Sequence, residues 1–227
     1  MGHGCRVCAV VLLAAGMLST AQAVSTYSGS LTYGGGGIAG VPGNSWLAGG
    51  TTFSWWIDAN GDGTYTYTYQ LQVPDDSKEI SHMTVEVSPT FTSDNLLEVL
   101  QGTIADDQPD DYPKGGSDVG MPSPLWGIKF EGGDGSTDYD WMVSFLSDRA
   151  PVWGDFYAVD GKKPGEETAI WNAGFAAADP LNPPANDSIG NHILVPDTNG
   201  YVPAPGAVLL ASVGMVLVRH LRARRWV

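Results

Sequence analysis

Residues 64–73 read TYTYTYQLQV, and this stretch decides the fold class. Aromatic and aliphatic residues alternate in it with threonine and glutamine. Those of one face are Tyr65, Tyr67, Tyr69, Leu71 and Val73. Successive side chains of a β-strand point to opposite faces, so this period of two predicts a strand with one face in a core and the other in water.

The neighbouring run TFSWWI, residues 52–57, is also rich in aromatic and β-branched residues. The two runs are separated by DANGDG, residues 58–63, in which Asn-Gly and Asp-Gly pairs favour a tight turn. The sequence therefore predicts a β-hairpin over residues 52–73.

The remaining chain repeats this pattern of short β-prone runs between Gly, Pro and Asp turns. The runs contain Met83, Val85 and Val87; Trp126, Ile128 and Phe130; Tyr139, Trp141, Val143 and Phe145; and residues 152–159, 169–175 and 192–195. A segment over 94–100 fits a helical turn or an edge strand, and residues 105–124 and 178–191 are predicted to be long connections, the first of them exposed. About eight short strands with no long helical period predict an all-β fold, a single antiparallel β-sandwich of the jelly-roll or Ig-like type spanning residues 24–200.

Charge and cysteine content exclude several function classes. The segment 58–197 holds all 25 acidic residues but only six basic ones, a charge of −19. Nucleic-acid binding needs a basic face, so nucleic acid is excluded as a partner. The two cysteines are Cys5 and Cys8. Disulfides, cysteine nucleophiles and thiolate metal sites are therefore excluded from the sandwich.

The first 23 residues have the organisation of a cleavable signal peptide. Arg6 supplies the positive charge, residues 7–18 are apolar, and Ala21 and Ala23 form an Ala-x-Ala cleavage site. The apolar run is shorter than the ~20 residues that a membrane-spanning helix needs. We expect general secretion machinery and signal peptidase to act on this segment and Val24 to begin the mature protein.

The hairpin loop offers a candidate calcium site. Asp58, Asn60 and Asp62 place oxygen donors at the first, third and fifth positions of a loop whose sixth residue is Gly63. A full EF-hand loop needs a carboxylate at position twelve, where this chain has Tyr69. Two interpretations remain open, a hairpin turn and a calcium site, and the sequence implies no other cofactor.

Aromatic residues offer a candidate carbohydrate site. Trp55 and Trp56 are adjacent in a predicted strand, so they face opposite sides and one of them is expected to be exposed or covered by a loop. An exposed tryptophan ring can stack on a sugar of an extracellular polysaccharide.

The sequence has no complete catalytic motif. His82 and His192 are interpreted as structural histidines, and the acidic cluster Glu131, Asp134, Asp138 and Asp140 as a solvated turn, with a hydrolase as the remaining reading of the acidic residues. The protein is therefore expected not to be an enzyme.

The C-terminal segment, residues 201–227, has the organisation of a sorting signal. Val202, Pro203, Ala204 and Pro205 precede an apolar run over 206–218, which is followed by Arg219, Arg222, Arg224 and Arg225. The run alone makes a helix of about 20 Å. With residues 201–205 and the arginine stems it reaches membrane length, with the arginines on the cytoplasmic side. A plain single-pass anchor is the alternative.

These residues resemble the PEP-CTERM sorting signal of bacterial exported proteins, which an exosortase recognises. The family usually has Glu between the two prolines, whereas Ala204 stands here, and Ala204-Pro205-Gly206 resembles an Ala-Pro-Gly variant. The resemblance implies a transient stay in the inner membrane, cleavage near the motif and display at the cell surface or release outside. We therefore expect an exported, non-catalytic surface or matrix protein, with a secreted, calcium-supported carbohydrate-binding module as the alternative.

Overall fold

The computed structural model describes residues 26–105, 108–112, 118–132, 139–160 and 168–196. These residues form fourteen strands in three antiparallel sheets, with two short 3-10 helices, η1 (Ser45–Ala48) and η2 (Ser93–Asn95). The predicted all-β fold is confirmed. Within these ranges no helix is long and apolar enough to cross a membrane.

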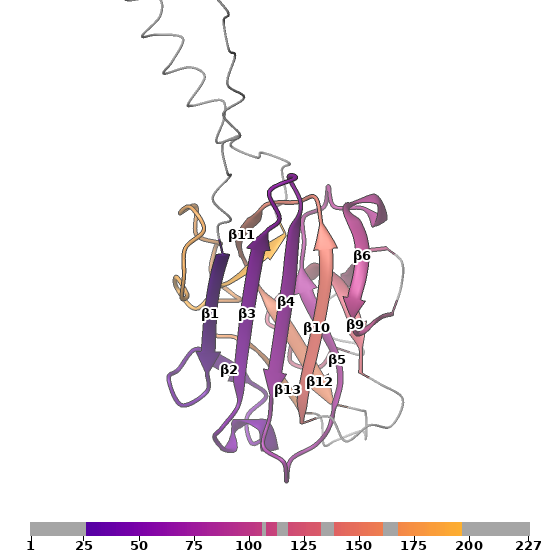
Figure 1. Cartoon of the computed structure of the whole chain (residues 1–227). Coiled ribbons are helices and arrows are strands. Elements are labelled where there is room, and N and C mark those ends of the chain that lie inside the picture. Colours follow the sequence, from indigo (N-terminus) through magenta and orange to yellow (C-terminus); the bar gives the residue numbers. More distant parts are fainter. Residues whose placement is uncertain (1–25, 106–107, 113–117, 133–138, 161–167, 197–227) are drawn as a thin grey trace, which may run out of the picture.

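The first sheet contains the predicted hairpin at its centre. Its strands lie in the order β1 (Thr26–Thr32), β3 (Thr52–Ala59), β4 (Tyr65–Gln72), β10 (Asp140–Ser147) and β6 (Leu96–Gln101) (Figure 1). β3 and β4 pair along their full length, with Ile57 opposite Tyr67. The segment around residue 95 forms both structures considered for it, because η2 leads directly into the edge strand β6.

The second sheet packs behind the first. Its order is β2 (Ile38–Gly40), β13 (Ala169–Asn172), β12 (Phe156–Asp160), β5 (Ile80–Glu86), β9 (Leu125–Glu131) and β7 (Thr103–Ile104), and β8 (Asp110–Tyr112) also pairs with β9. A separate pair contains β11 (Pro151–Gly154) and β14 (Ile193–Pro196). The single run predicted over 152–159 is thus divided between two sheets, and Asp155 is the residue at the break.

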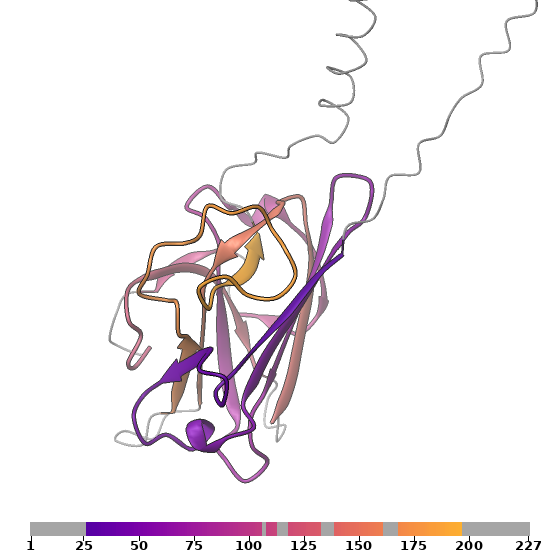
Figure 2. The same cartoon turned by 90° about the vertical axis from the view of Figure 1, so that its left-hand side faces the viewer.

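Aromatic side chains fill the space between the two large sheets, which lie face to face (Figure 2). Phe53 of the first sheet stacks on Phe156 of the second with ring centroids 3.8 Å apart. Phe145 and Phe130 form a second contact across the layers at 5.6 Å. Stacked and offset rings bury large apolar areas, so these pairs stabilise the sandwich-like packing.

The alternation expected for the hairpin is confirmed. Tyr67, Tyr69 and Leu71 are fully buried, whereas Thr68 and Gln70 between them lie on the outer face of the sheet. The buried tyrosines still satisfy their hydroxyls: Tyr67 donates to the carbonyl of Arg149, and Tyr69 donates to the carbonyl of Leu194. Both bonds join the first sheet to segments outside it.

The expectation that residues 105–124 form an exposed loop is wrong for part of the segment. Asp118 and Met121 are buried, and Met121 packs with Leu125, Tyr157 and Phe175 in a second, smaller core. The apolar residues of this loop were too sparse to show a period, but they pack against the second sheet. The predicted connection 178–191 does lack strands.

Both ends of the described domain lie at the same end of the molecule. β1 begins there and β14 ends there (Figure 1). The predicted signal peptide, with Ala21 and Ala23, and the predicted sorting segment 201–227 fall outside the described residues.

Candidate metal centre

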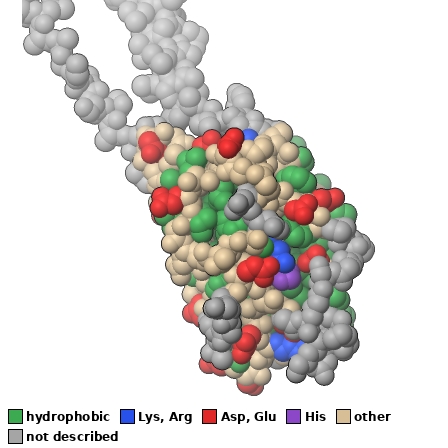
Figure 3. All heavy atoms as spheres, turned by 90° about the vertical axis from the view of Figure 1, so that its right-hand side faces the viewer, with side chains coloured by type: hydrophobic (Ala, Val, Ile, Leu, Met, Phe, Trp, Pro, Cys, Tyr) green, Lys and Arg blue, Asp and Glu red, His purple; other side chains and the backbone are tan. Residues whose placement is uncertain are grey.

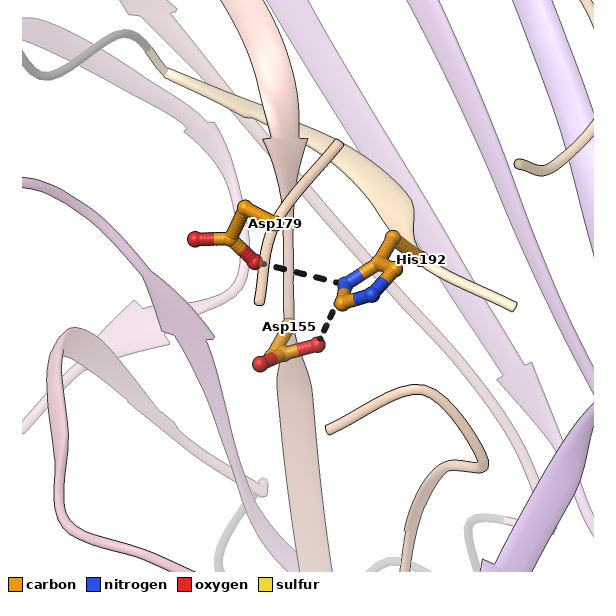
Figure 4. Close-up of side chains that lie close together, drawn as sticks. All are labelled: Asp155, Asp179 and His192. Atoms are coloured by element: carbon orange, nitrogen blue, oxygen red, sulfur yellow. Dashed lines mark ion pairs between the residues drawn. The ribbon is translucent and has the colours of Figure 1, made fainter. Parts of the chain in front are cut away.

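Three titratable side chains from distant parts of the chain meet beside the small β11–β14 pair. Asp155 lies between β11 and β12, Asp179 lies in the connection that follows β13, and His192 immediately precedes β14 (Figure 4). One donor atom from each residue lies within 4.8 Å of the others. The set of one imidazole nitrogen and two carboxylates is one that divalent metal ions use.

The imidazole of His192 is close to both carboxylates without being hydrogen-bonded to either. Its Nδ1 lies 3.0 Å from Asp155 Oδ1 and 3.3 Å from Asp179 Oδ1. Both contacts are ion pairs when the ring is protonated, and Nδ1 makes no hydrogen bond of good geometry with either oxygen. His192 and Asp155 are buried, whereas the Asp179 side chain is 43% exposed. The cluster therefore opens to solvent on the Asp179 side.

Asn172 of β13 fixes the position of Asp155. Its Nδ2 donates to Asp155 Oδ1 at 2.6 Å and to the carbonyl of Asn191 at 2.9 Å. Its Oδ1 accepts from the backbone N–H of Phe156 at 2.9 Å. The buried side-chain amide of Asn172 thus links Asp155, at the break between β11 and β12, to Asn191, the residue before His192.

Glu86, the last residue of β5, adds a third carboxylate beside the cluster. Its Oε2 accepts from the Asp155 N–H at 2.8 Å, and its own N–H donates to the Asp155 carbonyl at 2.9 Å. Burial, together with the nearby carboxylates of Asp179 and Asp155, raises the pKa of Glu86 to about 8, against smaller opposing effects of the Asp155 backbone hydrogen bond and His192. These interactions fix the backbone of Asp155 at the end of β5.

The local backbone explains how His192 reaches this position. Asn191 and Gly190 have φ of 62° and 59°, the left-handed conformation that asparagine and glycine tolerate best. The turn is closed by a hydrogen bond from the His192 N–H to the Ile189 carbonyl. The ring then packs on Gly174, where a Cβ would come within 2.9 Å of Nε2, so the missing side chain leaves room for the imidazole.

Electrostatics favour a positive charge at this ring. Burial alone lowers the pKa of His192, but the carboxylates of Asp155 and Asp179 outweigh it and raise the pKa to about 9. Either a proton on the imidazole or a cation between the three groups would supply that charge.

Comparison with known proteins gives no relative. No protein family, curated protein or solved structure matches the chain. The arguments that follow therefore rest on the geometry of this molecule.

The residues of the predicted calcium site make hydrogen bonds in and beside the hairpin turn. Asp62 Oδ1 accepts from the N–H and the hydroxyl of Thr64, which lowers the Asp62 pKa. Asn60 bonds the hydroxyls of Thr64 and Thr66, and Asp58 accepts from Thr26 at the start of β1. The turn interpretation accounts for these contacts, and calcium binding there stays a prediction.

The predicted carbohydrate residues separate as expected for neighbours in a strand. Trp55 is fully buried, so the assignment of Trp55 to a sugar platform is wrong: the inner face of β3 supports the core. Trp56 is 38% exposed on the outer face and stays a candidate.

The other acidic and histidine residues are divided between structural contacts. Glu131 pairs with Lys129 at 2.9 Å, and Asp140 accepts from Gln70 and Gln72. His82 is buried in β5 with its Nε2 3.3 Å from Asp118 Oδ1, which fits its structural interpretation. Asp134 and Asp138 lie outside the described residues, as do the sorting residues.

Sequence reasoning missed the cluster itself. Asp155, Asp179 and His192 are spaced by 24 and 13 positions and match no ligand motif. The available signal was indirect: an aspartate that interrupts a β-prone run, and a histidine at the end of a long Pro-rich connection. His192, interpreted as an ordinary structural residue, lies within ion-pair distance of two carboxylates.

Proposed function

We propose that this chain is an exported, non-catalytic protein of the cell surface or extracellular matrix, sorted by an exosortase through its C-terminal segment. Signal peptidase would remove residues 1–23. Residues 201–227 would hold the precursor transiently in the inner membrane until cleavage near Val202-Pro203-Ala204-Pro205-Gly206. Arg219, Arg222, Arg224 and Arg225 would stay on the cytoplasmic side.

One structural observation carries this proposal: β1 begins and β14 ends at the same end of the domain (Figure 1). A tail held at a membrane beyond residue 196 would leave the opposite end of the sandwich facing outward. The signals at both ends of the chain would then lie at one end of the domain and leave its opposite end uncovered.

A non-catalytic role is supported by the burial of the candidate centre. His192 and Asp155 are almost completely covered, and only Asp179 reaches solvent. A general base must come within hydrogen-bond reach of the proton that it removes, and a covered imidazole offers a substrate no such approach.

The exposed surface fits the same interpretation. Acidic side chains are spread over the face that includes β6 and β9, and basic ones are few (Figure 3). Such a surface is unsuited to nucleic acid.

Mass spectrometry of the protein recovered from the cell surface or medium tests the sorting proposal. We expect an N-terminus at Val24 and a C-terminus near Pro205. A Pro203→Ala, Pro205→Ala double variant should accumulate as membrane-bound precursor, whereas Val202→Ile should be processed normally. An intact Trp226-Val227 end in the final surface protein would refute processing and leave a plain anchor.

A carbohydrate-binding function is the second candidate, and the exposure of Trp56 favours it. This ring lies on the outer face of the first sheet, with Ser28 and Thr68 opposite it on the neighbouring strands. Hydroxyl side chains beside an exposed ring suit an extracellular polysaccharide, and the Asp58–Asp62 turn at the end of β3 would be its calcium support.

Glycan-array binding tests this second function. Binding should be lost in Trp56→Ala and kept in Tyr33→Ala, a control because Tyr33 is equally exposed at 37%. An array without hits would remove the carbohydrate function.

A further inference from the structure

We propose that Asp155, Asp179 and His192 form a binding site for one divalent transition-metal ion, with zinc as its best occupant, and that this ion ties the connection between β13 and β14 to the sandwich. The inference stands independently of the sorting tail, because all of its residues lie between β5 and β14.

The first argument is the position of the buried His192 nitrogen. Nδ1 lies 3.0 and 3.3 Å from the two carboxylate oxygens but makes no hydrogen bond of good geometry with either. A cation between the three groups would give this buried nitrogen a direct ligand bond.

The second argument is that ligands of one ion approach one another in this way. They direct their lone pairs at the metal and not at each other, so neighbouring donor atoms are close without being hydrogen-bonded. Tetrahedral Zn–N and Zn–O bonds of roughly 2.0–2.2 Å place adjacent ligand atoms about 3.3–3.6 Å apart. The distance from His192 Nδ1 to Asp179 Oδ1, 3.3 Å, matches this spacing, and the 3.0 Å to Asp155 Oδ1 is slightly shorter.

The third argument is charge. Asp155 and Asp179 bring two carboxylates to one place, and His192 is the one side chain that forms ion pairs with them in the described part of the chain. Even a charged imidazole leaves negative charge in excess when the carboxylates are ionised. Buried charges need a counter-charge or a metal, and a divalent cation supplies it.

The donor set selects the class of metal. Calcium and magnesium prefer shells made of oxygen alone, whereas imidazole suits zinc and its neighbours. No thiolate is available, because the two cysteines are Cys5 and Cys8. Zinc lies near the top of the affinity order for nitrogen and oxygen sites, above manganese and iron.

The supporting residues resemble those around known metal ligands. Asn172 donates to Asp155 Oδ1, and Glu86 accepts from the Asp155 N–H, so the carboxylate is held in place by a side chain and by its own backbone. Such outer contacts orient ligands and increase affinity. Asp179 comes from a segment without strands, so the ion would join that segment to Asp155 and His192.

Calorimetric titration of the purified full-length chain in detergent, after removal of bound metal with a chelator, tests the proposal. We expect one zinc ion per chain and binding at least 100-fold tighter than that of calcium. Asp179→Asn should weaken zinc binding at least tenfold. This side chain is exposed, so the variant is expected to fold.

Asp187→Asn is the matched control, because Asp187 is an exposed aspartate in the same connection and loses the same charge. Its zinc affinity should stay within twofold of the unmodified protein. Equal zinc affinities of the two variants, calcium binding as tight as zinc binding, or no bound zinc would each overturn the proposal. A second check is His192→Gln, which should abolish binding, whereas His82→Gln should retain it.

Discussion

Asn172→Ala removes three hydrogen bonds at once and should be among the most damaging single polar substitutions. The alanine leaves the N–H of Phe156, the carboxylate of Asp155 and the carbonyl of Asn191 without this amide. Two of these bonds are buried. A buried group left without a partner costs about 1–3 kcal/mol, so we expect a loss of about 2–5 kcal/mol in the free energy of unfolding. That is a large share of the about 5–15 kcal/mol typical of a native protein.

Urea unfolding followed by tryptophan fluorescence measures this loss. With a slope of about 2–3 kcal/mol per molar urea, the midpoint should fall by about 1–2 M. Asn182→Ala, at an exposed position of the same connection, is the control and should leave the midpoint unchanged. A loss below about 1 kcal/mol for Asn172→Ala would refute the view that this amide holds the cluster together.

Further predictions follow from the same structure. The native pKa values of His192 and Glu86 are raised, from 6.5 to about 9 and from 4.5 to about 8, so the metal-free native state binds more protons than the unfolded state. Their contribution is complete below pH 4.5, and the free energy of unfolding should fall as the pH rises from 4.5 to about 8 for Glu86 and from 6.5 to about 9 for His192; a rise from pH 4.5 to 9 in urea titrations would contradict the sign. Gly174→Ala would press a methyl group against the Gly190 carbonyl oxygen and the His192 ring, and we expect it to cost about 1–3 kcal/mol and to weaken zinc binding in calorimetry. Phe53→Ala should cost about 3–5 kcal/mol in urea unfolding because the ring is fully buried. Trp56→Ala should cost about 1 kcal/mol or less, and equal losses for the two would refute the assignment of inner and outer faces.

The regular part of the fold could be predicted from the sequence because its signal is local. The alternation of tyrosine and threonine over 64–73 predicts which face is buried, and β4 has that face in the core. The turn between Ala59 and Tyr65 follows from its glycines, since Gly61 and Gly63 have φ of 79° and 95°. Neighbouring residues determine both features.

The candidate centre could not be predicted in the same way. Its donors come from a strand break, a connection and a turn, and only the tertiary fold brings them together. Burial of His192 depends on the packing of β14 against β11, which pair although some forty residues separate them. The burial of the loop that carries Asp118 could not be predicted for a related reason. Its apolar residues are few and show no period, and they become buried only because they pack against the second sheet.

The strand order has a consequence for how the molecule acquires its structure. β10 pairs with both β4 and β6, and β12 pairs with both β5 and β13, so strands from the second half of the chain complete both sheets. A nascent chain that ends before Asp140 has no partner for the inner edges of β4 and β6. Such non-local pairing is slow, with folding times of milliseconds to seconds in sandwiches of this kind. Neither sheet can therefore be completed until the second half of the chain has been made, although β1, β3 and β4 can pair with one another before that.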